Sequence, residues 1–136
     1  MGTNVSREIH EVMEASQAGK LIFPEVVRRL MEAGVESYFC DLAAMQETFY
    51  LRDGAPHVEK MTLPVAAIAE DYSSTGLIVA IRGAQTDAVR YPEFAKRSAE
   101  AGVIGYWAFL TGKKVIYFGR KGEFHVEEFP RHKTES

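Results

Sequence analysis

Cysteine, tryptophan and long apolar runs are scarce in this chain of 136 residues, which holds one cysteine and one tryptophan. The single cysteine, Cys40, excludes a disulfide within the chain and favours a reducing compartment. The longest apolar stretch, residues 77–81, is far too short to span a bilayer. The polar start of the sequence predicts no signal peptide. We therefore expect a cytoplasmic protein.

A basic excess is also missing, since the formal net charge is −3. Proteins that bind nucleic acid or anionic membranes usually carry a basic surface, so neither partner is expected. The only glycine-containing stretch that invites comparison with a phosphate loop, residues 82–85, lacks the required length and glycines. No cofactor is predicted, and no motif defines a set of metal ligands.

What the chain does contain is a repeat. Shifting the sequence by 68 positions gives 14 identities in the 37 positions from Phe23 to Glu59, without a gap. Chance would give about two matches at typical residue frequencies. The clearest anchors are residues 24–25 over 92–93, residues 32–35 over 100–103, and residues 57–59 over 125–127. The sequence therefore predicts an internal duplication.

Each repeat predicts a helix that starts at a proline and stops at a glycine. Pro24 and Pro92 suit a first helical turn, where the missing N–H is not needed. Gly34 and Gly102 suit a left-handed helix end, which places the helices at about 24–33 and 92–101. Glu25 is spaced to form an ion pair with Arg29, as Glu93 is with Arg97.

Three strands are expected after each of these helices, and a further helix before it. Branched and aromatic residues mark strands at about 35–42, 48–52 and 56–61, and again at 103–110, 115–119 and 124–129. A stripe at helical spacing predicts a helix that includes residues 5–13, and residues 73–85 form its apolar counterpart. The Ala-rich segment within residues 62–71 is a further helix candidate.

These elements predict one α+β domain over residues 1–130, followed by a polar tail at 131–136. It is built from two helix–helix–three-stranded antiparallel meander units, about 3–61 and 71–129, related by a pseudo-two-fold axis. A lone meander exposes its edges and one apolar face, so the copies are expected to share a core. Either one six-stranded antiparallel sheet or two packed three-stranded sheets would satisfy this requirement.

The motifs at residues 91–94, 100–103, 117–120 and 125–130 together resemble those of the YdfO-like bacterial family of unknown function. Its members are often labelled phage envelope proteins. The resemblance is best over residues 80–130. It implies the same fold, and it supplies neither an activity nor a catalytic residue.

A duplicated His-x-Glu is the first candidate site. Residues two apart on a strand share a face, so His57 emerges beside Glu59, and His125 beside Glu127. A two-fold axis could bring both pairs to one metal ion or support acid–base chemistry. Alternatively, each pair is solvated or bonds to a helix across the meander. Cys40 could act as a nucleophile, but its counterpart Ala108 indicates a small buried position.

Aromatic residues give the second candidate site. Ile104, Tyr106, Ala108 and Leu110 are expected on one strand face, with Val103, Trp107 and Phe109 on the other. Both faces are apolar, whereas the first copy has Ser37 and Asp41 on the second face. The strand is therefore either buried on both sides or lines a ligand groove or subunit contact. Tyr38 and its counterpart Tyr106 complete this candidate set.

Three functions stay open at this point. The leading one is a non-enzymatic module that binds a small molecule or protein in a cleft near the pseudo-two-fold axis. The second is a metal-dependent enzyme that uses the four His-x-Glu residues. The third is a self-associating, phage-derived accessory protein that forms a homodimer.

Overall fold

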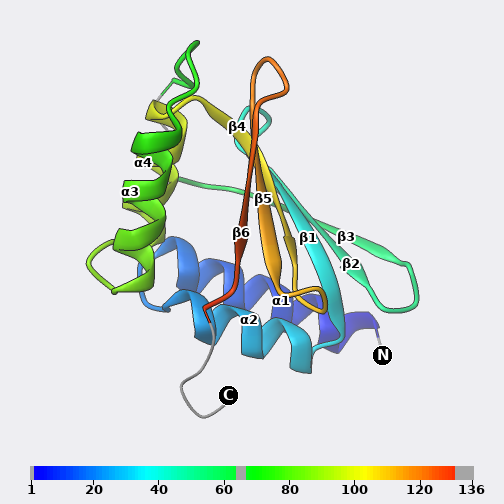
Figure 1. The fold of residues 1–136 in the computed structure, drawn as a ribbon. Helices are drawn as coiled ribbons and strands as arrows, with labels where there is room; N and C mark the ends of the chain where they lie inside the picture. Colours follow the sequence, from blue (N-terminus) through cyan, green and yellow to red (C-terminus); the bar gives the residue numbers. More distant parts are fainter. Residues whose placement is uncertain (1, 64–66, 131–136) are drawn as a thin grey trace.

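The computed structural model describes residues 2–63 and 67–130 as one α+β domain with four helices and a six-stranded sheet (Figure 1). The elements in chain order are α1 (Gly2–Gln17), α2 (Phe23–Glu32), β1 (Val35–Asp41), β2 (Gln46–Leu51), β3 (Pro56–Lys60), α3 (Ser74–Gln85), α4 (Tyr91–Glu100), β4 (Val103–Phe109), β5 (Lys114–Gly119) and β6 (Phe124–Glu128). The expected helices and strands are confirmed with shifts of a few residues at their ends.

The strands form a single antiparallel sheet in the order β3-β2-β1-β4-β5-β6. Of the two architectures expected from the sequence, the continuous six-stranded sheet is therefore correct. The two meanders join through β1 and β4, where Phe39 lies opposite Trp107. The central strands therefore hold the aromatic residues that the sequence singled out.

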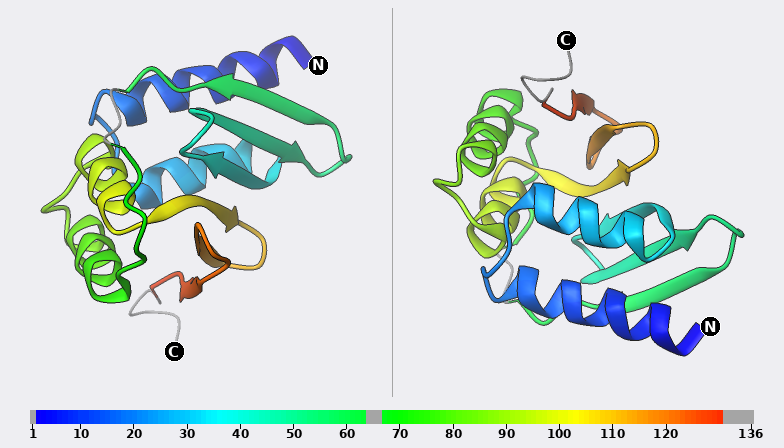
Figure 2. Two further views of the ribbon diagram at one scale, coloured as in Figure 1. Left: turned by 90° about the horizontal axis from the view of Figure 1, so that it is seen from above. Right: turned by 90° about the horizontal axis from the view of Figure 1, so that it is seen from below.

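All four helices pack on one face of the sheet. The pair α1 and α2 lies near β1–β3, and the pair α3 and α4 lies beside β4 at a steep angle to the first pair (Figures 1 and 2). Between the helices and the sheet lies one core, whose largest fully buried side chains include Phe49, Ile9, Leu30, Leu77 and Leu110. The opposite face of the sheet carries no helix among the described residues.

The start and end signals of α2 and α4 hold in detail. A proline occupies the first turn of each, and Gly34 and Gly102 just beyond their ends adopt φ values of +97° and +87°. Arg97 binds Glu93 as expected, at 2.9 Å. The expected Glu25–Arg29 pair does not form. Arg29 instead binds Glu8 of α1 at 3.1 Å, because helix packing offers it a partner across the α1–α2 contact.

Two further expectations need correction. The segment that joins the halves has no helix in its described residues, 62–63 and 67–71, while residues 64–66 and the tail at 131–136 lie outside the described residues. Val103 does not share the face of Trp107. A bulge between Val103 and Gly105 interrupts the alternation of β4, so that Val103 is fully buried in the core.

Candidate functional site

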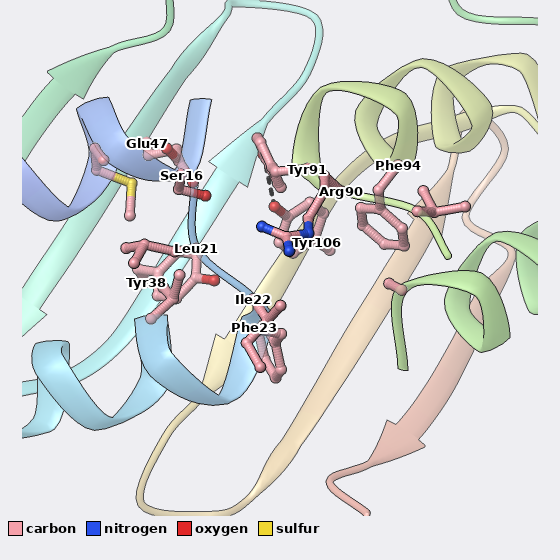
Figure 3. Close-up of a pocket in the computed structure, with 14 residues that line it drawn as sticks. Ser16, Leu21, Ile22, Phe23, Tyr38, Glu47, Arg90, Tyr91, Phe94 and Tyr106 are labelled. Carbon is pink, nitrogen blue, oxygen red and sulfur yellow. Dashed lines mark hydrogen bonds between the residues drawn. The ribbon is translucent and has the colours of Figure 1, made fainter. Parts of the chain in front are cut away.

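A small cavity lies between the helix-covered face of the sheet and the first turns of α2 and α4 (Figure 3). Its volume is about 60 Å³. Strand residues form its floor, notably Tyr38 of β1, Glu47 of β2 and Tyr106 of β4. The helices and the residues just before α2 and α4 contribute the apolar walls and one charged side chain, Arg90. The cavity therefore has mainly aromatic and apolar walls, and its polar side chains are those of Ser16, Glu47, Arg90 and three tyrosines.

Glu47 is the unusual member of this cavity. It is 2% exposed, and its Oε1 atom is buried without a hydrogen-bond partner. Burial, reinforced by the negative charge of Glu59 on the neighbouring strand, raises the pKa of Glu47 to about 8, although the Cys40 thiol opposes the shift. Burial disfavours the charged form of a carboxyl, so Glu47 is protonated near neutral pH. Perturbed carboxyls in cavities are candidates for functional groups.

Three hydroxyl and thiol groups form a chain beside Glu47. Tyr106 donates a hydrogen bond of 2.7 Å to the hydroxyl of Tyr91, and the Cys40 Sγ lies 3.4 Å from that same hydroxyl. Burial raises the pKa of the Cys40 thiol and of both tyrosines well above their ordinary values. Cys40 therefore stays a thiol, which argues against a nucleophilic role. The network instead fixes the orientation of the tyrosine rings around the cavity.

Arg90 is the single cationic residue among those lining the cavity. Its guanidinium is held away from Glu47 by other acceptors, since it binds both carboxylate oxygens of Asp87 and donates a 2.9 Å bond to the carbonyl of Gly19. These contacts place Arg90 at the helix junction. The carboxyl of Glu47 therefore has no cationic partner from the cavity lining.

The cavity lining has a regular relation to the sequence repeat. Twelve of its fourteen residues form six pairs spaced 68 positions apart: Ser16 and Ala84, Leu21 and Val89, Ile22 and Arg90, Phe23 and Tyr91, Val26 and Phe94, and Tyr38 and Tyr106. The two unpaired members are Met13 and Glu47. The residue 68 positions after Glu47 is Val115, which is buried but lies outside the cavity. The fold therefore accepts an apolar side chain, Val115, at the position that corresponds to Glu47.

The first His-x-Glu pair binds helix α1. Glu59 accepts hydrogen bonds from His57 at 2.6 Å and from His10 of α1 at 2.8 Å, while Ser6 lies 3.3 Å from the other nitrogen of His57. Burial acts to raise the pKa of Glu59, but these two histidines outweigh it and lower the pKa. The pair therefore attaches β3 to α1.

The second pair does the same for α3. Glu127 accepts bonds from His125 at 3.0 Å, from Arg82 at 2.6 Å and from Gln85 at 3.0 Å. Here too burial opposes the partners, and the Arg82 and His125 bonds lower the pKa of Glu127. Both His-x-Glu pairs therefore bond to a helix across the meander, which is one of the alternatives raised from the sequence.

The structure does not bring the two pairs together. They lie on β3 and β6, the opposite edges of the sheet, and five strand spacings of about 4.8 Å separate those edges. Within residues 2–63 and 67–130 there is no group of three or more histidine, cysteine or acidic side chains that could hold a metal ion. A metal centre shared by the four His-x-Glu residues is therefore geometrically excluded.

Trp107 and Phe109 lie on the open face of the sheet. Trp107 packs against Phe39 with ring centroids 5.3 Å apart, stacks on Tyr50 at 5.8 Å, and stacks on Phe109 at 5.6 Å. These four aromatic residues are half-buried. Beside Phe109 is an open hollow of about 390 Å³. Helices therefore cover the Tyr106 face of β4 and leave the Trp107 face open. Because both faces are apolar, the sequence could not indicate which one is covered.

A larger hollow of about 600 Å³ lies over α2 and the end of β6, lined mainly by apolar residues. Its two charged lining residues, Arg28 and Glu32, are exposed and pair with each other at 3.4 Å. No buried polar group points into it among the described residues. The tyrosine-lined cavity is therefore the better candidate site.

Sequence reasoning found two members of that cavity, Tyr38 and Tyr106, and missed Glu47. The available signal was the alignment of the sequence with itself at a shift of 68 positions, in which Glu47 stands against Val115. Comparison with known proteins adds no assignment, since no family model matches the chain and no curated protein is significantly similar to it. Among the described residues, no helix has the length and apolar character needed to cross a membrane.

Proposed function

We propose that this protein is a non-enzymatic binding module that takes a small molecule into the tyrosine-lined cavity. The observation that carries the proposal is Glu47, a buried carboxyl with an unpartnered oxygen in the cavity wall. Leaving such a group unpaired costs about 1–3 kcal/mol. Since the fold accepts Val115 at the corresponding position, the cost of Glu47 is explained by a ligand that pairs with it.

The proposal includes an internal duplication with a pseudo-two-fold axis. Support comes from the strand registers, because every pair in the β1–β2 and β2–β3 ladders recurs 68 positions later in β4–β5 and β5–β6, including the bulge. Phe39 also pairs with Trp107, its own counterpart. Such an axis would pass beside the cavity, whose lining takes eight residues from the first half and six from the second.

A fragment screen by two-dimensional NMR tests the binding function on the whole chain. Fragments that enter the cavity should shift the resonances of Tyr38 and Tyr106. The Ala84→Leu variant fills the cavity and should abolish these shifts. The matched control is Ala43→Leu, which adds the same atoms at an exposed turn position. Circular dichroism shows whether both variants keep the fold.

The two variants distinguish a ligand-binding cavity from a merely structural one. Fragments that lose affinity in Ala84→Leu and keep it in Ala43→Leu support a ligand-binding cavity. If no fragment shifts the cavity resonances, or if Ala84→Leu binds fragments as the wild type does, the proposed function is wrong.

A second candidate function is self-association through the open face of the sheet. The observation that favours it is the half-buried aromatic group of Phe39, Tyr50, Trp107 and Phe109, because interfaces are enriched in aromatic residues. The strand alternation places two basic and two acidic residues around this face: Lys60, Lys114, Asp41 and Glu128. Glu36 adds a third acidic side chain at the hollow beside Phe109. A surface that carries both signs suits a second copy of itself better than a strongly charged partner.

A further inference from the structure

We infer that the ligand of the cavity is a small organic ammonium ion, with Glu47 as its counter-ion and the rings of Tyr38, Tyr91 and Tyr106 as its walls. This inference rests on the proposed function and adds the chemical class of the ligand. It follows from three properties of the cavity: its charge, its aromatic lining and its size.

The charge of the cavity selects a cation. Glu47 has an oxygen without a partner, and the only cationic lining residue, Arg90, is engaged by Asp87 and Gly19. A buried carboxylate is costly unless an opposite charge pairs with it. A bound cation would supply that charge and so favour the ionised carboxylate, whereas an anionic ligand would gain no opposite charge and would oppose ionisation of Glu47. Neutral ligands would leave the charge of Glu47 uncompensated whenever it ionises.

The aromatic lining favours an organic cation over a metal ion. Tyr38, Tyr91, Phe94 and Tyr106 surround the cavity, and a hydrogen bond between the hydroxyls fixes the rings of Tyr91 and Tyr106 (Figure 3). Cations are attracted to the faces of such rings, and the attraction grows when the site is desolvated. A metal ion would need several carboxylate, imidazole or thiolate ligands, and Glu47 is the only residue of these types in the lining.

The size of the cavity limits the ligand. A water molecule needs about 10–15 Å³ of such space, so about 60 Å³ accommodates a ligand of roughly four or five non-hydrogen atoms. Trimethylammonium and tetramethylammonium ions have this size. The ammonium head of a longer amine would fit in the same way if its chain left the cavity beside Arg90.

Binding would release a proton. Glu47 is protonated near neutral pH because burial raises its pKa to about 8. A cation that binds the carboxylate takes the place of the proton, which leaves to solvent. The titratable groups that face Glu47 are Glu59 on β3, Cys40 and Tyr38 on β1, Tyr106 on β4 and Tyr91 on α4. Arg90, just before α4, lines the cavity but is bound to Asp87 and Gly19, and α1 contributes only the uncharged Met13 and Ser16.

Because a proton is released, the affinity for the cation should depend on pH. Below the pKa of Glu47 each cation displaces one proton, so affinity should rise about tenfold per pH unit between pH 6 and 8 and then level off. Glu59 does not contribute to this rise in affinity, because its histidine partners keep its pKa low. A neutral ligand that merely accepts a hydrogen bond from protonated Glu47 would bind more weakly as pH rises.

Isothermal titration of the full chain with tetramethylammonium chloride, from pH 6 to 9, tests the inference. The neutral comparison ligand is tert-butanol, which has the same number of non-hydrogen atoms. We expect saturable binding of tetramethylammonium, a tenfold gain in affinity per pH unit up to about pH 8, and release of about one proton per cation at pH 6, measured in two buffers of different ionisation enthalpy.

The variants are Glu47→Gln and, as a matched control, Glu127→Gln, which removes a half-buried carboxylate outside the cavity. Glu47→Gln should weaken tetramethylammonium binding at least roughly tenfold at pH 8, and Glu127→Gln should leave it unchanged. If tert-butanol binds as tightly as the cation and Glu47→Gln changes neither affinity, the ammonium assignment is overturned while the binding module stands. If neither ligand binds at any pH, the ammonium assignment also fails, and the fragment screen then decides the binding module separately.

Discussion

Glu47 and Val115 occupy the same place in the two strand ladders, since Glu47 pairs with Cys40 on β1 as Val115 pairs with Ala108 on β4. Both side chains are buried against the helices. One half of the sheet therefore meets the requirements of the fold with an apolar residue, and the other half holds an acid at a cost. This difference makes Glu47 the best single residue on which to test function.

The first prediction concerns stability against pH. The pKa of Glu47 is about 8 in the folded protein against an ordinary value of 4.5, so the folded state binds the extra proton between these values. The stabilisation contributed by protonated Glu47 is complete below pH 4.5 and is lost as the pH rises toward 8. Above pH 8 the free energy of unfolding no longer changes with this group. Replacement by glutamine removes this dependence. Relative to Glu47→Gln, the wild type should lose about 5 kcal/mol at most between pH 4.5 and 9.

Urea unfolding of both proteins at several pH values measures this difference. Comparing the two proteins matters because His10 also contributes to the pH dependence, its pKa being raised by its hydrogen bond to Glu59. The stability linked to His10 is likewise lost as pH rises, but it is common to both proteins and cancels. An equal stability difference at pH 5 and pH 9 would show that Glu47 is not held protonated.

The second prediction concerns the paired tyrosines. Tyr91→Phe leaves the buried hydroxyl of Tyr106 without its acceptor, which should lower the free energy of unfolding by about 1–3 kcal/mol. Adding Tyr106→Phe removes the orphaned donor, so the double variant should cost less than the sum of the single variants. Tyr72→Phe serves as control, because the Tyr72 hydroxyl already lacks a partner and its loss should be nearly neutral. Additive losses in thermal or urea unfolding would contradict a coupled pair.

The third prediction separates a structural His-x-Glu pair from a metal site. Glu59→Gln loses charge-assisted bonds to His10 and His57 and should cost about 1–2 kcal/mol at pH 7. Since the pKa of Glu59 is lowered, this contribution is full above pH 4.5 and disappears as the pH falls through the lowered value. The exposed Glu100→Gln should change little.

Zinc provides the decisive comparison for that pair. A melting temperature that is unchanged by Zn²⁺ in wild type and variant alike is the expected result. A rise of several degrees in the wild type, absent from Glu59→Gln, would identify a metal site at β3 and α1.

The sequence alone predicts the elements of this fold better than it predicts the site. Pro24 and Gly34 state where a helix begins and ends through local backbone preferences that act before any packing. The burial of Glu47 depends instead on which face of β2 the helices cover, and that choice follows from packing of the whole chain. For the same reason the alternation in β4 could not reveal that Val103 leaves the face of Trp107, since a bulge shifts the register there.

The last prediction addresses self-association. One row of side chains on the open face runs across all six strands from Val58 through Phe39 and Trp107 to Val126, which is 42% exposed. A charge at Val126 adds little strain to the monomer because the side chain already meets solvent. Inside a dimer interface the same charge would be desolvated without a partner, so Val126→Lys should weaken association at least roughly tenfold. Val79→Lys, at an exposed position of α3 away from this face, should have no effect.

Sedimentation velocity at two concentrations measures the association directly. In the wild type the dimer fraction should rise with concentration, and the emission of Trp107, the only tryptophan, should shift to shorter wavelength as its exposed part becomes covered. In Val126→Lys both changes should move to higher concentration. A wild type that stays monomeric throughout would eliminate a second copy as the occupant of this face. The aromatic group would then act within the monomer, where Trp107 of β4 contacts Phe39 of β1 and Tyr50 of β2 and so joins three strands without any partner.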